Sequence, residues 1–240
     1  MTFRIKYSVS PSYLTGGSLR RPSLPMNQVR FIVAHDTGNP GSTAANNVAY
    51  YERSRDDMEA SAHIFVDDSD IIECIPFLSG PAEKAWHVVY NTPIDNQTFG
   101  VDANDCAGGI ELCYGENING KEAYQRYVWV MAYACWRYGL DPATDITAHF
   151  ILDPSRKIDP KNALSPLGIT FEQFLNDVKQ EYDTCIQKEP EPMLDKGVAQ
   201  TIISTWISPA WHQMTGNRDQ QDYLHWLANE LRKAAGLDPE

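Results

Sequence analysis

Two histidines, His35 and His149, each stand at the end of an apolar, strand-like run that leads into turn residues. A strand that ends in an imidazole beside a loop is one way in which a rigid scaffold presents a metal ligand at a cleft. Asp159 follows the second histidine after a short loop and can supply a third ligand, which leaves a fourth position for water. This set of residue types predicts a metal-dependent hydrolase.

Zinc is a metal that suits this donor set. Zinc sites that perform hydrolysis use three protein ligands and lower the pKa of a water molecule to about 7. Two neutral imidazoles and one carboxylate leave a centre that is still positive and able to polarise an amide carbonyl. In the alternative interpretation, His35 and His149 are hydrogen-bonded to the backbone and Asp159 caps a turn. The spacing alone leaves both interpretations open.

Two further charged residues are candidates for the chemistry itself. Glu111 lies in an apolar run, where a carboxylate is costly to bury without a partner or a function. It is either a general base or a structural residue in a salt bridge. Lys157 precedes Asp159 by two positions, so an extended segment would point both side chains to one face. A lysine there can stabilise an oxyanion, whereas most lysines in charged loops are simply solvated.

Two other histidines compete for a place in the site. His63 lies within an alternating strand-like run, so the face on which it stands is open, and it is either a packed residue or a site residue. His87 follows Trp86 in an irregular segment, residues 76–104, that is rich in Gly, Pro and Asn. A loop of that length inside a compact domain is usually functional. Trp86 and His87 therefore suit a wall that contacts a substrate.

Strands and helices that would position these residues alternate along the chain. Short apolar runs predict strands, apolar residues at helical spacing predict helices, and the helix that ends before Gly139 has the clearest pattern. Such an alternation is typical of an α/β domain with a mixed central β-sheet flanked by helices. The expected strands are residues 29–34, 62–66, 71–75 and 108–113, and the expected helices are residues 42–53, 122–138 and 170–186.

The sequence predicts two domains. Residues 1–188 form the catalytic domain, with an extended N-terminal arm over about residues 1–28, and residues 187–192 form a charged, Pro-bearing linker. Residues 193–240 form a small C-terminal helical module, too short to bury much core alone, so it packs on the first domain or pairs with a partner. Its aromatic side chains either bind a cell wall or form a small core; they are Trp206, Trp211, Tyr223 and Trp226.

Composition excludes several classes of partner. The formal net charge of −12 argues against binding of nucleic acid and against docking to an anionic membrane.

The cysteines and the N-terminus indicate where the protein is made. Five cysteines in no metal-like spacing are expected to be reduced core thiols. The N-terminus has no signal-peptide pattern and no run is long enough to span a bilayer, so we expect a protein made in a cytoplasm without a Sec signal.

Six short motifs occur in order between about residues 29 and 165. They are residues 33–39, 61–67, 85–87, 109–112, 148–149 and 156–160. Together they resemble the type 2 N-acetylmuramoyl-L-alanine amidases, a family related to phage T7-like lysozymes and to peptidoglycan recognition proteins. The sequence departs from the family in two places: Asp159 stands where many relatives have cysteine, and residues 88–90 replace the usual small residue and glycine after the Trp-His pair.

The resemblance implies a mixed sheet flanked by helices and one zinc ion that cleaves the amide between N-acetylmuramic acid and L-alanine. Each candidate residue takes a role by its place in a motif. The ligands are His35, His149 and Asp159; the general base is Glu111; the lysine that stabilises the intermediate is Lys157; and the cleft walls are His63, Trp86 and His87.

The combination of an amidase-like domain, a short C-terminal module and no export signal resembles phage endolysins of Gram-positive hosts. This resemblance implies synthesis in the host cytoplasm and action on the cell wall after release, which causes lysis. Two alternatives stay open: a non-catalytic muropeptide-binding protein, and a cytoplasmic recycling amidase that acts on soluble anhydro-muropeptides. A pure binder would not need the complete set of candidate ligands, base and lysine, and the extra module argues against a recycling enzyme.

Overall fold

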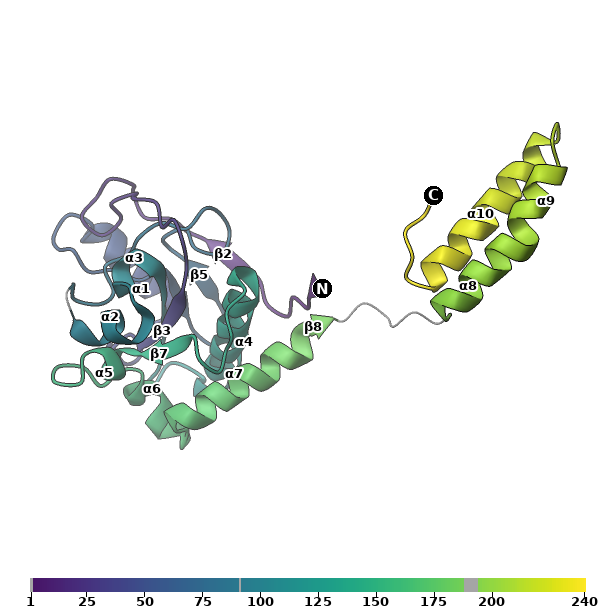
Figure 1. Cartoon of the computed structure of the whole chain (residues 1–240). Coiled ribbons are helices and arrows are strands. Elements are labelled where there is room, and N and C mark those ends of the chain that lie inside the picture. Colours follow the sequence, from purple (N-terminus) through teal and green to yellow (C-terminus); the bar gives the residue numbers. More distant parts are fainter. Residues whose placement is uncertain (1, 91, 188–193) are drawn as a thin grey trace. The chain divides into compact units, whose positions relative to one another are not determined.

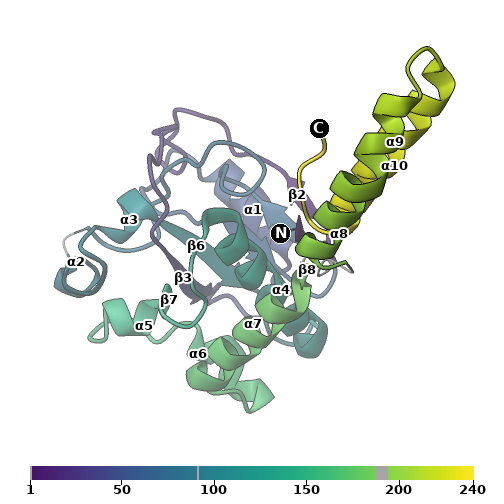
Figure 2. The same ribbon diagram turned by 45° about the vertical axis from the view of Figure 1, so that its right-hand side comes forward.

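The computed structural model describes residues 2–90, 92–187 and 194–240. The chain forms two compact units, one from Phe3 to Ile186 and a smaller one from Gln187 to Glu240 that also takes in Thr2. Gln187 ends a short strand, and the rest of the expected linker lies outside the described residues. Figures 1 and 2 show both units.

The larger unit is built on a mixed sheet of six strands in the order β2-β5-β4-β6-β3-β7. β4 and β5 are antiparallel and the other pairs are parallel. The central strand β3 is buried along its whole length, as expected of a continuous apolar run covered on both faces. The strands are β2 (Val9–Pro11), β3 (Phe31–Asp36), β4 (Ile64–Val66), β5 (Ile71–Glu73), β6 (Ala107–Leu112) and β7 (Ile146–Ala148). A separate two-stranded sheet consists of β1 (Thr2–Phe3) and β8 (Ile186–Gln187).

Helices cover both faces of this sheet (Figure 1). α4 (Gly120–Tyr138) and α7 (Phe171–Cys185) pack on the face that carries Ile32 and Ile110, where they form the main core. The opposite face carries Phe31 and Val33, and it is covered by shorter helices and loops. These elements are α2 (Pro93–Phe99), α3 (Ala103–Cys106) and α5 (His149–Leu152). α1 (Ala44–Arg53) packs against β4 and β5. α6 (Lys161–Leu164), which adds Ala163 and Leu164 to the main core, is followed directly by the 3-10 turn η1 (Ser165–Leu167). The mixed sheet flanked by helices confirms the predicted architecture.

The predicted irregular segment, residues 76–104, contains helix α2 and the first two residues of α3. Both helices are too short to display an amphipathic repeat, so the turn-forming residues around them dominate the sequence pattern. The N-terminal arm also contributes more than packing, because β2 adds a parallel strand at the edge of the sheet. Within the described ranges, no helix is both long and apolar enough to cross a bilayer.

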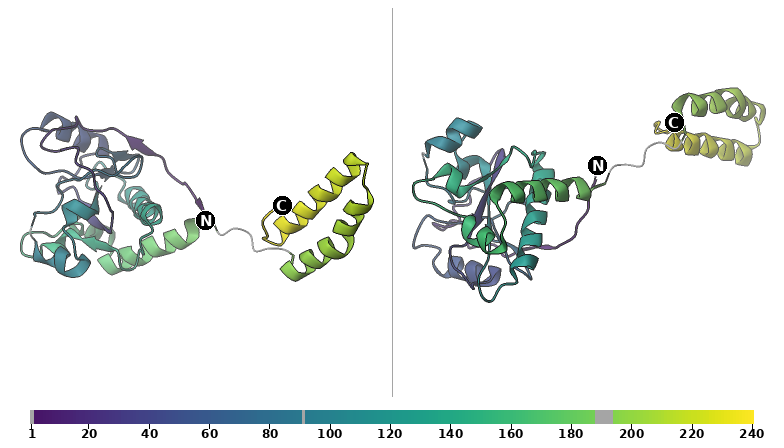
Figure 3. Two further views of the ribbon diagram at one scale, coloured as in Figure 1. Left: turned by 45° about the horizontal axis from the view of Figure 1, so that its top comes forward. Right: turned by 90° about the horizontal axis from the view of Figure 1, so that it is seen from below.

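The smaller unit is a helical hairpin, shown from two further directions in Figure 3. One arm consists of α8 (Lys196–Ile202), the π-helical turn η2 (Ile203–Ile207) and α9 (Ser208–Gln213), and the other is α10 (Arg218–Ala234). The contact between the arms is aliphatic. It is made by Ile203, Ile207 and Ala228 with Ile202, Leu224, Leu227 and Leu231 around them. Trp206, Tyr223 and Trp226 are more than half exposed, so the interpretation that the aromatic residues form this small core is wrong.

Candidate metal centre and active site

Strand register places His35 and Glu111 side by side. β3 and β6 are parallel, and His35 on β3 pairs directly with Glu111 on β6. Side chains two residues apart on a strand share a face, so His35 stands on the face of Phe31 and Val33 rather than on the face that packs against α4. Both residues lie near the carboxyl ends of their strands, which is the edge where parallel sheets commonly place their sites.

The structure brings His35, His149 and Asp159 together. His149 begins α5 directly after β7, and β7 pairs with β3, so the two histidines arrive from neighbouring parallel strands. Nδ1 of His35 lies 2.9 Å from Oδ2 of Asp159, and Nδ1 of His149 lies 3.0 Å from the same oxygen. One ligand atom from each residue falls within 4.8 Å of the others, as a shared cation requires.

Electrostatics leave this cluster with the charges that zinc prefers. Burial lowers the pKa of His35 to about 4, so the imidazole is neutral at pH 7 and its nitrogen can donate a lone pair. Burial alone would raise the pKa of Asp159, but the contacts of its Oδ2 with the imidazoles of His149 and His35 hold it well below the usual range. Two imidazole nitrogens and one carboxylate oxygen form a donor set of the kind found at catalytic zinc.

A buried atom beside the cluster also suits a metal site. Among the described residues, Oε2 of Glu111 is buried without a hydrogen-bond partner. Buried polar atoms are nearly always paired, and the exceptions call for an explanation such as a catalytic role or a bound ion. The orphaned carboxylate oxygen and the donor set together fit a divalent cation held by His35, His149 and Asp159.

Glu111 and Lys157 face the same cavity as the cluster. Burial raises the pKa of Glu111 well above its ordinary value, and the negative charges of Asp159 and Asp36 raise it further. The positive charge of Lys157 acts in the opposite direction, so the ammonium group is close enough to act on this carboxylate. Lys157 and Asp159 both line the cavity, and residues 154–156 before them form a turn.

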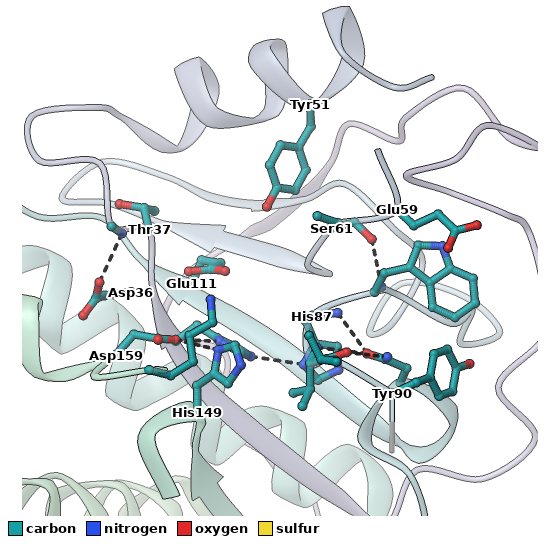
Figure 4. Close-up of a pocket in the computed structure, with 18 of the residues that line it drawn as sticks. Asp36, Thr37, Tyr51, Glu59, Ser61, His87, Tyr90, Glu111, His149 and Asp159 are labelled. Atoms are coloured by element: carbon teal, nitrogen blue, oxygen red, sulfur yellow. Dashed lines mark hydrogen bonds and ion pairs between the residues drawn. The ribbon is translucent and has the colours of Figure 1, made fainter. Parts of the chain in front are cut away.

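The cavity itself has a volume of about 480 Å³. Figure 4 shows Asp159, His149 and Glu111 at one end and Glu59 and Tyr90 at the other, with His87 between them. Trp86 also lines it, and the rings of Trp86 and Tyr90 lie 5.6 Å apart as an aromatic pair. Trp86 and His87 thus lie where the sequence predicted, on a wall beside the reactive groups.

His63 does not line the cavity, which differs from the prediction that it forms a wall of the cleft. The side chain is fully buried. Its Nε2 donates to the carbonyl of Glu83 at 2.9 Å, and its Nδ1 accepts from the backbone N–H of Gly109 at 2.9 Å. His63 therefore ties the loop after β5 to strand β6, as a buried structural histidine.

This burial of His63 predicts a loss of stability in acid. The pKa of His63 falls from 6.5 to about 4 on folding, so the unfolded chain binds one more proton than the folded chain between those values. The free energy of unfolding should fall as the pH drops from 6.5 to 4, by about 3 kcal/mol from this group. Urea titrations of the wild type and His63→Gln across this range measure it. Identical pH dependence in the two proteins would show that His63 does not titrate this way.

Three residues that position the site were not identified from the sequence. Asp36 accepts hydrogen bonds from the backbone and side chain of Asn162, both at 3.0 Å, and so ties β3 to the segment after Asp159. The Tyr127 hydroxyl contacts the carbonyls of His35 at 3.0 Å and Ile110 at 3.1 Å. Asn104 is described below with His87. Of these three residues, only Asp36 could have been noticed in the sequence, because a carboxylate at the end of an apolar run, directly after a candidate ligand, is unusual.

Comparison with known proteins gives a consistent result. The sequence profile of the N-acetylmuramoyl-L-alanine amidase family matches residues 25–162. The N-acetylmuramoyl-L-alanine amidase BlyA of Bacillus subtilis (strain 168) is 30% identical over 171 residues, which are 69% of this chain and 44% of BlyA. The chain thus spans less than half the length of this curated relative.

Solved structures resemble the larger unit. The catalytic domain of XlyA has a TM-score of 0.57 at 21% identity, over 72% of this chain and 99% of that domain. A mutant endolysin from Bacillus subtilis has a TM-score of 0.56 at 21% identity, over 71% of this chain and 98% of that chain. At this level of identity the likeness establishes the fold.

Proposed function

The chain belongs to the N-acetylmuramoyl-L-alanine amidase family, and we propose that it is a zinc-dependent hydrolase of peptidoglycan. The bond cleaved is the amide between N-acetylmuramic acid and L-alanine of the stem peptide. One observation carries the proposal: the side chains of His35 on β3, His149 at the start of α5 and Asp159 in the loop before α6 converge directly beside Glu111. A muropeptide-binding protein needs a cleft but not this set of groups.

His35, His149 and Asp159 would hold the zinc ion. When bound, zinc supplies Lewis acidity, which polarises an amide carbonyl and makes water more acidic. Burial raises the pKa of Glu111, and a nearby cation would lower it again, so its carboxylate suits both accepting a proton from the attacking water and returning it to the leaving nitrogen. The ammonium group of Lys157 faces the same cavity and suits stabilisation of the developing oxyanion.

The far end of the cavity suits substrate binding. Trp86 and Tyr90 offer two aromatic faces there, and aromatic side chains contribute a large contact area at low entropy cost. Glu59 adds an exposed carboxylate at the same end. A glycan chain and its stem peptide therefore have room to extend away from the reactive groups toward these side chains.

The biological role that we propose is lysis of a Gram-positive cell wall by a phage or prophage lysin. Support comes from the fold, which resembles that of an endolysin from Bacillus subtilis, and from family membership.

The proposed activity is tested by elemental analysis of the purified protein together with mass spectrometry of digested walls. We expect about one zinc per chain and new muramic acid and L-alanine ends. Zinc-loaded protein that binds walls without producing these ends would be a binder, and cleavage of soluble fragments alone would indicate a recycling amidase.

We further propose that the helical hairpin contributes to wall binding. Trp206, Tyr223 and Trp226 are exposed while an aliphatic contact holds the hairpin together, so replacing them should leave its fold intact. The triple alanine variant should show weaker co-sedimentation with purified walls and an unchanged zinc content. Tyr50→Ala, a similarly exposed aromatic in the larger unit, is the matched control and should sediment like the wild type. Equal sedimentation of all three proteins would exclude the hairpin aromatics from wall binding.

A further inference from the structure

A second histidine connects His35 to the backbone of strand β6. Nε2 of His87 lies 3.0 Å from the carbonyl oxygen of Ala107, and Nδ1 of His87 lies 3.1 Å from Nε2 of His35. The two rings are perpendicular, with centroids 5.2 Å apart. His35 in turn points its Nδ1 at Asp159. The carbonyl of Ala107, the imidazoles of His87 and His35, and the carboxylate of Asp159 thus form one continuous chain of polar contacts.

Counting protons along this chain fixes the tautomers. A carbonyl oxygen only accepts hydrogen bonds, so Nε2 of His87 must carry the proton that the Ala107 carbonyl accepts. A neutral imidazole has one N–H, so Nδ1 of His87 is an acceptor, and Nε2 of His35 must be the donor to it. His35 then has no proton on Nδ1. Its Nδ1 lone pair faces a carboxylate oxygen of Asp159 at 2.9 Å, an arrangement that a cation satisfies.

We infer that His87 is a positioning residue that holds His35 in the Nε2–H tautomer and so presents the Nδ1 lone pair to zinc; this inference rests on the zinc site proposed above. A partner on the far nitrogen orients a metal-bound histidine and raises its basicity. His149 differs, because its Nε2 has no such partner among the described residues. The support is therefore specific to one of the two histidine ligands.

His87 is itself held in place from two sides. Oδ1 of Asn104 accepts the backbone N–H groups of His87 and Val88, both at 3.0 Å, which fixes the start of the loop. On the other side the ring lies against Gly109, where an added Cβ would come within 2.6 Å of Cγ of His87. Any side chain at position 109 would therefore displace the ring. A residue held this firmly can impose an orientation on its neighbour.

Zinc affinity measured by chelator competition on the full-length protein tests the inference. His87→Phe keeps a ring but removes the acceptor, and we expect its zinc dissociation constant to rise by roughly 10- to 100-fold. His87→Asn places an amide oxygen near the position of Nδ1 and should recover much of this loss. His212→Phe makes the same replacement at an exposed histidine of the helical hairpin and should bind zinc like the wild type. If His87→Phe binds zinc as tightly as the wild type does, the inference is wrong.

A direct measurement on the wild type does not depend on how the variants fold. In zinc-loaded protein with nitrogen-15-labelled histidine, we expect the proton of His35 on Nε2 and a scalar coupling from that nitrogen to Nδ1 of His87. A proton on Nδ1 of His35 would overturn the inference while leaving zinc binding intact. A wild type that binds no zinc at all would instead overturn the proposed function, so the two failures are distinguishable.

Discussion

Replacing His35 by alanine should remove zinc and peptidoglycan cleavage together. His35 is almost completely buried, and its Nδ1 is one of the three donor atoms that converge at the site. Two remaining ligands hold zinc weakly, so we expect less than one tenth of the wild-type zinc content after dialysis. Hydrolytic enzymes commonly accelerate their reactions by ~10⁶-fold or more. Since the proposed mechanism depends on the metal, turnover should fall by at least about 10³-fold.

The matched control for this change is His212→Ala, which removes an exposed histidine from the helical hairpin. It should keep full zinc content and full activity. Circular dichroism and thermal melting of His35→Ala against metal-free wild type separate loss of the ligand from loss of the fold. A folded His35→Ala protein that keeps stoichiometric zinc and clears walls at the wild-type rate would disprove the ligand assignment.

Replacing Glu111 by glutamine should remove catalysis but not zinc, which distinguishes it from the replacement of His35. Glutamine keeps the shape of the side chain but cannot accept a proton at neutral pH, so general base catalysis is removed. Such losses are typically of the order of 10²- to 10⁴-fold in kcat. KM should change little, because the carboxylate acts on the reacting atoms rather than on the bound glycan. Steady-state kinetics on soluble muropeptides measure both constants.

The control here is Glu116→Gln, which neutralises an exposed carboxylate just beyond β6. Its kcat should match that of the wild type. A Glu111→Gln protein with wild-type kcat would remove Glu111 from the mechanism, whereas one that loses zinc as well would point to a role in holding the metal. Elemental analysis of each sample before the assay distinguishes these results.

Part of the site could be predicted because strand alternation is a local rule, whereas the complete set of ligands, base and lysine came from the resemblance to the amidase family. Val33 and His35 share a face by alternation, and Glu111 falls beside His35 once β3 and β6 pair in parallel. His63 shows where such rules stop. It has the same parity as Phe65, which pairs with Glu111, but it lies two residues earlier, just before the first residue of β4. That displacement, about 6.6 Å along a strand, takes its ring beneath the loop around Glu83.

Other features depend on contacts between distant segments, which the sequence does not display. The contact between His87 and His35 requires the loop after β5 to fold back across β6, and Gly109 makes room for it. The sequence pattern placed His87 on a wall but gave no sign of its hydrogen-bonded partners. The irregular composition around α2 likewise hid a helix whose seven residues are too few to set a period.

The contacts of Asp36 bear on how much of the metal site exists before an ion arrives. Asp159 lies 124 residues from His35 along the chain, and bringing such distant segments together has a large entropic cost. Asp36 accepts hydrogen bonds from Asn162 and Ala163, so folding alone anchors the segment that carries Asp159 to the strand that carries His35. Binding of the ion therefore has to order little more of the chain. Most of the free energy of coordination then contributes to the affinity of the site for the ion.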